Sequence, residues 1–133
     1  MSYQGDYKHN STVRVTVTTH AQTGAAVAPS SAFEAADVLI YKNGSATQRA
    51  SASGVTMTSP FDTITGLHIV TIDLSDNADP GFYAPGNDYS VVLSPDETVD
   101  GLAVVKEIAS FSIRNRSVPA RFAQGVAMAG AFA

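Results

Sequence analysis

Three histidines, His9, His20 and His68, have the widest chemical range in this sequence, because imidazole binds metals and carries protons near neutral pH. None has a partner at the His-x-His or His-x-x-x-His spacing that places two imidazoles on one metal ion. His68 lies between Leu67 and Ile69 in a strand-like run. We expect it to point outward on a polar face, so the histidines predict neither a metal site nor a general base.

An oxygen-rich stretch, DLSDNADPG, offers a second kind of chemistry. Clustered carboxylate and amide oxygens are the ligands that Ca²⁺ prefers. The order of residues differs from the calcium-loop pattern D-x-[DN]-x-[DN]-G, and the bidentate Glu is missing. Asp, Asn and Pro also form turns, so a solvated loop is favoured and an ion site is the alternative. The residues concerned are Asp73, Asp76, Asn77 and Asp79.

A second acidic stretch, SPDETVD, places Asp96, Glu97 and Asp100 close together in sequence. Two of these carboxylates could act as acid and base, but a charged hairpin tip between strands is the favoured interpretation. The chain has no cysteine, no Gly-x-Ser-x-Gly elbow and no glycine-rich phosphate loop. We therefore expect a protein that is not an enzyme and that needs no cofactor or metal.

Charge is distributed unevenly along the 133 residues, whose formal net charge is −4. Residues 1–102 carry 11 acidic and 4 basic residues, whereas residues 103–133 carry one acid and four bases. An acidic body repels phosphate, so nucleic acid is not an expected partner. No signal-like or membrane-length apolar segment is apparent, which predicts a soluble protein without a membrane partner.

The elements that must position these residues are short strands. TVRVTVTT alternates Val13, Val15 and Val17 with polar residues, and residues 89–93 alternate in the same way. Asn43-Gly44 predicts a tight hairpin turn leading to a second extended piece at residues 47–50, and Pro85-Gly86 predicts another turn. Further strands are expected in GVTMTS, DTITG and LHIVTIDL, the last with a bulge between Ile69 and Ile72.

Seven or eight such strands and no convincing helix before Ser117 predict an all-β fold, an antiparallel Ig-like β-sandwich with an extended C-terminal arm. A small closed barrel is the alternative. The predicted organisation is an N-terminal segment at residues 1–11, the sandwich at 12–116 and the arm at 117–133, with the final strand kinked near Lys106-Glu107. Tyr89 follows a turn at a strand entry, the setting of a tyrosine corner. Structural roles are therefore expected for Tyr89, Gly86 and Gly44.

Eight short motifs follow one another along residues 5–116. In this order and spacing they resemble a β-sandwich module found in structural proteins of tailed double-stranded DNA bacteriophages. They are Tyr41-Lys42-Asn43-Gly44, Gly54-Val55-Thr56, Phe61-Asp62, Thr65-Gly66-Leu67-His68, Phe82-Tyr83-Ala84-Pro85-Gly86, Asp88-Tyr89, Thr98-Val99-Asp100-Gly101 and Ser112-Ile113-Arg114-Asn115-Arg116. The resemblance implies a virion protein of the head surface, tail fibre or baseplate.

Fibre proteins usually add a long repetitive or coiled shaft to this module, and the 133-residue chain is too short to hold one. Its length therefore favours a capsid decoration (cement) protein on the outer head surface, assembled in the host cytoplasm. The expected partners are then the major capsid protein and further copies of the chain, as a homotrimer. A tail-fibre, baseplate or receptor-binding module that recognises a host surface is the alternative.

The C-terminal residues are the expected partner-binding site. Pro119 ends the final strand, and the apolar side chains beyond it are too thinly spaced among Ala and Gly to form a core of their own. We expect an arm that docks on a neighbouring subunit or on the capsid, although a short helix or a tail folded back on its own sandwich are alternatives. The predicted contact residues are Arg114, Arg116, Arg121, Phe122, Val126, Met128 and Phe132.

Overall fold

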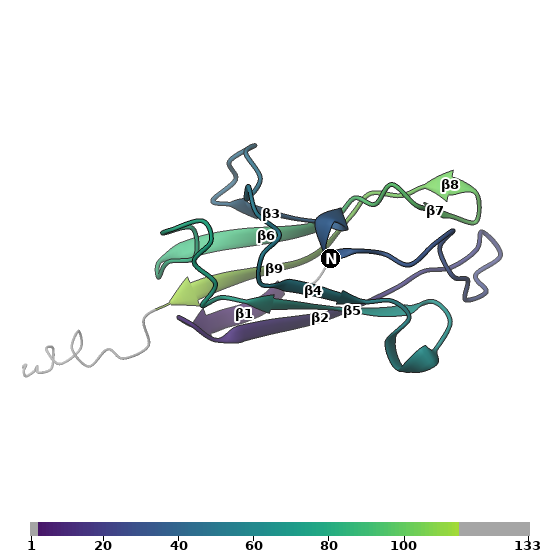
Figure 1. Ribbon diagram of the computed structural model, residues 1–133, viewed down its shortest axis with the longest axis horizontal. Coiled ribbons are helices and arrows are strands. Elements are labelled where there is room, and N and C mark those ends of the chain that lie inside the picture. The colour runs from purple at the N-terminus through teal and green to yellow at the C-terminus, as the bar shows by residue number, and fades with distance from the viewer. Residues whose placement is uncertain (1–2, 115–133) are drawn as a thin grey trace, which may run out of the picture.

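Two β-sheets pack face to face around one apolar core in the computed structural model, which describes residues 3–114 (Figure 1). The first sheet has the order β1 (Tyr3–Lys8), β9 (Lys106–Arg114), β6 (Asn87–Leu93) and β3 (Val38–Lys42). The second has the order β2 (Thr12–Thr18), β5 (Leu67–Asp73) and β4 (Val55–Thr58). The prediction of an all-β fold is confirmed.

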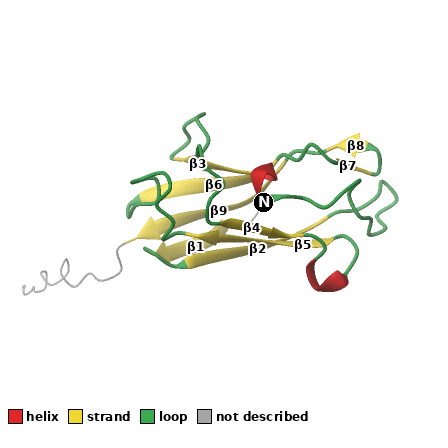
Figure 2. Cartoon of the chain, in the orientation of Figure 1, coloured by secondary structure: helices red, strands yellow, loops and turns green. Residues whose placement is uncertain are grey.

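The remaining elements are small and gather toward one end of the sandwich (Figure 2). A two-stranded hairpin consists of β7 (Thr98–Val99) and β8 (Leu102–Ala103), and two 3-10 turns are η1 (Ala35–Asp37) and η2 (Phe61–Thr63). No helix within residues 3–114 has the length and apolar character needed to cross a membrane.

The alternating sequences form the core as expected. Val13, Val15 and Val17 of β2 are buried while the residues between them are exposed. In β6, Tyr89, Val91 and Leu93 face inward in the same way. Period-two alternation sends successive side chains to opposite faces of a strand, so these two strands bring the inner faces of the two sheets together.

Two expectations about strand β5, a bulge and an outward-facing His68, are wrong. The strand pairs with β2 and β4 in unbroken register, so the bulge expected between Ile69 and Ile72 is absent. His68, Val70 and Ile72 form the inward face, and His68 is only 1% exposed rather than on a polar outer face. Leu67 and Ile69 are half-buried on the other face. Because β5 has apolar residues on both faces, the sequence shows no clear two-residue alternation that would indicate which side chains point inward.

The N-terminal boundary is also corrected, because Tyr3–Lys8 is a strand of the first sheet rather than a separate segment. β1 pairs in parallel with β9, with a shift of register between Tyr3 and Asp6. The sheet is therefore mixed, not antiparallel throughout. No hairpin joins these two strands, which lie about a hundred residues apart in sequence, so chain connectivity imposes no antiparallel direction.

The turn expected at Asn43-Gly44 forms, but two of the extended segments expected nearby do not form regular strands. Asn43 and Gly44 both have positive φ, and Ser45 N–H donates to Lys42 O at 3.0 Å, as in a hairpin turn. The returning chain makes only one isolated bridge, Tyr41 with Gln48. The segment DTITG forms no strand, and its first two residues, Asp62 and Thr63, belong to η2.

Strand β9 carries the irregularity expected near Lys106-Glu107. Val91 lies opposite Ala109 and Val92 lies opposite Glu107, so Ile108 is an extra residue in β9. An extra residue on one strand is a β-bulge, which bends the strand and increases its twist. The irregularity therefore lies directly beside the predicted position.

Candidate functional site

Of the predicted partner-binding residues, the structure describes one. Arg114 ends β9 and forms ion pairs within its own chain, at 3.7 Å to Asp6 and 3.4 Å to Asp88. Its side chain remains 42% exposed, so these contacts are weak surface pairs. The other predicted contact residues lie outside the described residues; they are Arg116, Arg121, Phe122, Val126, Met128 and Phe132.

Tyr89 has the geometry expected of a tyrosine corner. Its ring is 1% exposed and stacks on Phe111 at 5.1 Å between centroids. Its hydroxyl donates to Phe82 O at 2.7 Å and accepts from Ala84 N–H at 2.9 Å, which ties the loop before β6 to the strand itself. Gly86 has φ of 87°, and its N–H donates to Ile113 O at 2.6 Å.

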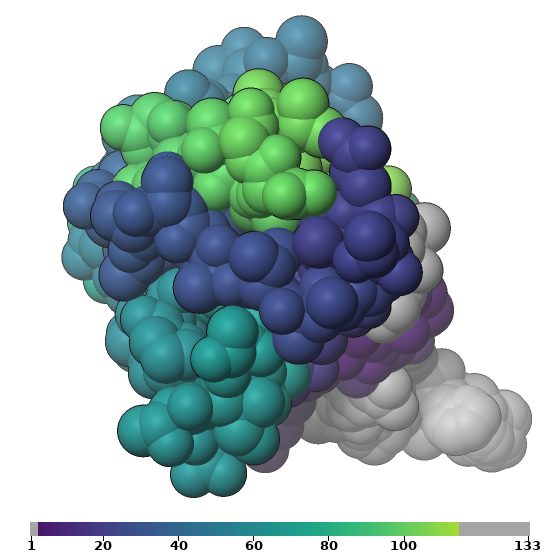
Figure 3. All heavy atoms as spheres, turned by 90° about the vertical axis from the view of Figure 1, so that its right-hand side faces the viewer, coloured from purple at the N-terminus to yellow at the C-terminus, as the bar shows by residue number. Residues whose placement is uncertain are grey.

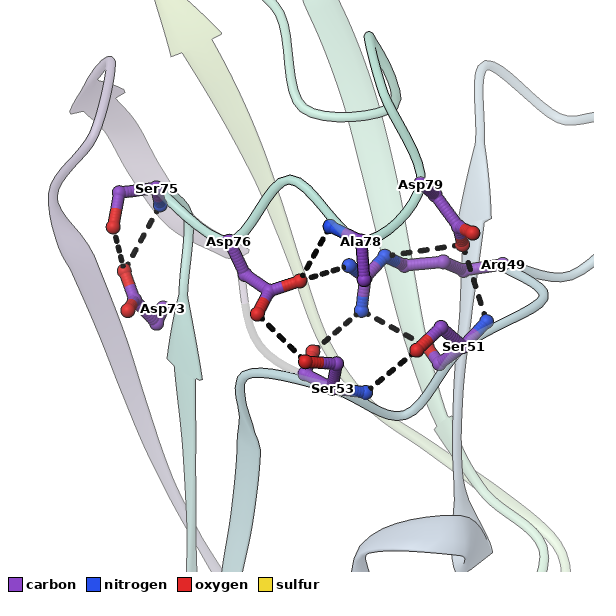
Figure 4. A network of polar contacts seen from close by, with 8 residues as sticks. All are labelled: Arg49, Ser51, Ser53, Asp73, Ser75, Asp76, Ala78 and Asp79. Atoms are coloured by element: carbon purple, nitrogen blue, oxygen red, sulfur yellow. Dashed lines mark hydrogen bonds and ion pairs between the residues drawn. The ribbon is translucent and has the colours of Figure 1, made fainter.

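A buried arginine, Arg49, organises the stretch that sequence analysis interpreted as a solvated acidic loop (Figure 4). Its Nη2 donates to Asp76 Oδ1 at 2.7 Å, and its Nη1 donates to the carbonyl oxygens of Ser51 and Ser53 at 2.9 and 2.7 Å. Asp79 pairs with Nε at 3.5 Å, without hydrogen-bond geometry. Asp76 and Asp79 therefore pair with a buried guanidinium group, so the interpretation of this stretch as a solvated loop is wrong.

The surrounding groups stabilise this charge arrangement. Hydrogen bonds from Ala78 N–H, from the Ser53 hydroxyl and from Arg49 lower the pKa of Asp76 below its usual value. The guanidinium also lies 4.9 Å from the centroid of the Tyr83 ring, a cation–π contact. Burial, partly offset by Arg49, raises the pKa of Tyr83 to about 12, and its hydroxyl is buried without a partner among the described residues.

His68 connects the ends of three strands through two hydroxyl groups. Thr19 donates its hydroxyl hydrogen to Val27 O at 2.6 Å, so the His68 Nε2–H donates to Thr19 Oγ1 at 3.0 Å. His68 Nδ1 then accepts from the Ser59 hydroxyl at 2.8 Å. The cavity beside this pair is about 130 Å³, below the range of small-molecule sites. The arrangement fits a structural histidine.

The pH dependence of stability tests this description of His68. Burial, and then the positive charge of Lys106, lower the pKa of His68 below 6.5. Between the two pKa values, His68 is protonated in the unfolded chain and neutral in the folded chain. The free energy of unfolding therefore falls as the pH drops below 6.5 toward the pKa of His68 in the folded chain. The slope contributed by this one group is at most about 1.4 kcal/mol per pH unit. Urea unfolding between pH 5 and 7.5 should show a shallower slope for His68→Gln, and equal slopes would contradict the description.

A third cluster joins Asp37 to two residues of the second acidic stretch, Asp96 and Glu97. Asp37 immediately precedes β3, and residues 94–97 follow β6; β3 and β6 pair with Val38 opposite Leu93. Ser94 N–H extends this ladder by donating to Asp37 O at 2.9 Å. One oxygen from each of the three carboxylates lies within 4.8 Å of the others. Asp37 was not among the predicted residues, because only the pairing of β3 with β6 brings it beside Asp96 and Glu97.

The electrostatics of this cluster are unusual. Glu97 Oε1 is buried and has no hydrogen-bond partner within residues 3–114, while Oε2 lies 3.5 Å from the Ser31 hydroxyl. Burial raises the pKa of Glu97, and a hydrogen bond with the Asp37 side chain and the negative charges of Asp37 and Asp96 raise it further, while a hydrogen bond from the Glu97 backbone N–H acts in the opposite direction. Within the described part of the chain, no lysine, arginine or histidine pairs with any of the three carboxylates.

An open groove of about 500 Å³ runs along β2, where β1 and β9 of the first sheet approach it. Its lining includes the exposed Arg14, the inward valines Val15 and Val17, and residues 106–108 of β9, which are Lys106, Glu107 and Ile108. Lys106 Nζ donates to Thr18 O at 3.2 Å across one end of the groove. The groove therefore presents two cations and one carboxylate, and its lining is more polar than apolar.

Comparison with protein-family models, with curated proteins and with solved structures finds no match to this chain. The class that the geometry itself defines is an all-β domain with two facing sheets. Among the described residues, the Arg49 and His68 clusters are hydrogen-bonded into the fold, whereas the cluster of Asp37, Asp96 and Glu97 retains an unpartnered oxygen.

Proposed function

We propose that this protein is a structural component of a tailed-phage virion, a decoration (cement) protein that binds the outer capsid surface. The observation that carries the proposal is the separation of charge between the folded domain and the C-terminal residues. Residues 3–114 contain all 12 acids and 6 of the 8 bases, a net charge of −6. Arg116 and Arg121 follow, with no acid after them. An acidic body and a basic arm are complementary between neighbouring copies.

The position of β9 supports this role, since the arm continues from the strand that ends at Arg114. β9 lies inside its sheet, paired with β1 on one side and β6 on the other. An arm anchored to an interior strand transmits tension to two ladders of backbone hydrogen bonds, whereas an edge strand has one. The proposed partners are the major capsid protein and further copies of this chain in a trimer.

Removal of the arm tests the proposal. A chain lacking residues 117–133 should remain folded, because the core lies within residues 3–114, but should no longer assemble or load onto capsids. A full-length chain carrying Arg116→Glu and Arg121→Glu should lose loading in the same way. Binding to undecorated capsids is measured by co-sedimentation, and circular dichroism checks the fold. Normal loading by both variants would refute the role of the arm.

The groove along β2, lined by two cations and one acid, favours a second candidate, a tail-fibre, baseplate or receptor-binding module that recognises a host surface. Arg14→Glu removes an exposed cation of the groove without touching the arm. It should leave capsid loading unchanged under the first proposal and weaken host binding under the second. Stained gels of purified virions separate the two, since a decoration protein is present in numbers comparable with the major capsid protein.

A further inference from the structure

We propose that Asp37, Asp96 and Glu97 form a Ca²⁺ site that ties the start of β3 to the loop between β6 and β7. The inference is independent of the virion role. It starts from charge, because three carboxylates converge where no basic side chain of residues 3–114 pairs with them. Like charges at this distance repel unless a cation or a proton stands between them.

The second observation is the unpartnered oxygen of Glu97. Glu97 is half-buried as a whole residue, but its carboxylate is buried and Oε1 meets no donor in the described chain. A buried polar atom without a partner costs free energy, which a bound ion would recover. Asp37 is itself buried, and its Oδ2 accepts from Glu34 N–H at 2.8 Å, which leaves its other oxygen for the ion.

Geometry favours Ca²⁺ among the hard cations. Calcium accepts six to eight oxygens at about 2.3–2.6 Å, so two ligands on opposite sides of the ion lie about 4.6–5.2 Å apart. Three oxygens that are all within 4.8 Å of one another can reach one such ion. Mg²⁺ requires about 2.0–2.1 Å and near-octahedral geometry and gives up its water ligands reluctantly, so it is the comparison ion for the test. Asp96 is exposed, so water can complete the coordination.

The site would act at one end of the sandwich, opposite the end at which β9 reaches Arg114 (Figure 1). Figure 3 views this end directly and shows the residues near 100 packed against residues 20–35. Those segments meet through the bridge of Pro29 with Val99 and through Ser30 N–H, which donates to Thr98 O at 2.8 Å. An ion bound beside these contacts would hold the β7–β8 hairpin to the sheet.

Calcium titration of the full chain tests the site. After treatment with EDTA, addition of about 5 mM CaCl₂ should raise the melting temperature by about 5 °C or more, if affinity lies in the range of extracellular calcium modules. In NMR spectra, amide signals of residues 34–38 and 94–99 should move, and those of β2 should not. MgCl₂ at the same concentration should have a smaller effect.

Substitutions distinguish a bound cation from a shared proton. Glu97→Gln should abolish the calcium response while leaving the metal-free protein at least as stable as the unmodified chain, since it removes like-charge repulsion. Asp62→Asn, an exposed acid in η2, removes the same charge elsewhere and should leave the response intact. A melting temperature unaffected by calcium, or a response that survives Glu97→Gln, would overturn the proposal. If calcium has no effect and Glu97→Gln raises the melting temperature at pH 7.5, the carboxylates share a proton instead.

Discussion

Replacing Arg49 with alanine is expected to destabilise the protein by about 3–5 kcal/mol, the cost of removing one partner from a buried ion pair. The side chain is 1% exposed and meets two carboxylates and two carbonyl oxygens. Its loss leaves the carbonyls of Ser51 and Ser53 without their donor. It also removes a planar cation packed on the Tyr83 ring. Solvent can rehydrate the acids, whose side chains are 18% and 25% exposed, so the low end of the range is the firmer expectation.

Urea unfolding followed by circular dichroism measures the change. Arg14→Ala is the matched control, since Arg14 is an exposed arginine on β2 and surface substitutions usually change stability by about 0.5 kcal/mol or less. Arg49→Lys should fall between the two, because an ammonium group lacks the planar fork that reaches both backbone carbonyls and a carboxylate. If Arg49→Ala and Arg14→Ala unfold at the same urea concentration, the network contributes no net stability.

The parts of the fold that could be predicted from sequence are those governed by local pattern. Alternation identified β2 and β6 and the direction of their side chains, and Asn43-Gly44 identified a turn with positive φ. In β5 the same rule failed, because Leu67 and Ile69 are apolar on the outer face and obscured the inward position of His68. Amphipathic periodicity is informative only where one face is polar.

The polar clusters could not be predicted, because each joins residues that are distant in sequence. Arg49 meets Asp76 across 27 positions, and neither residue carries a local signal of burial. Asp37 meets Glu97 only because β3 and β6 pair in antiparallel fashion, which sets the beginning of one strand beside the end of the other. Strand pairing is a property of the whole sheet. The two acidic stretches are visible in the sequence, but their partners in the folded chain are not.

Tyr89 is the residue for which local sequence did predict a tertiary contact, and its substitution should have the second large effect. Tyr89→Ala is expected to cost about 3–5 kcal/mol, as for other large buried aromatic residues. The ring stacks on Phe111 and also contacts Phe82 and Tyr83, at 5.6 and 5.7 Å between centroids. Its removal opens a cavity between the core and the loop that precedes β6.

Tyr89→Phe separates the ring from the hydroxyl. It should cost about 0.5–1.5 kcal/mol, because it keeps the aromatic packing and deletes the hydrogen bonds to Phe82 O and Ala84 N–H. Tyr83→Phe is the matched control, since the Tyr83 hydroxyl is buried without a partner within residues 3–114 and its deletion should cost nothing or stabilise the protein. Thermal unfolding of the two variants compares a bonded hydroxyl with an unbonded one in the same aromatic cluster. Equal melting temperatures would show that Tyr89 is only a packed ring, and the corner would then have no energetic role.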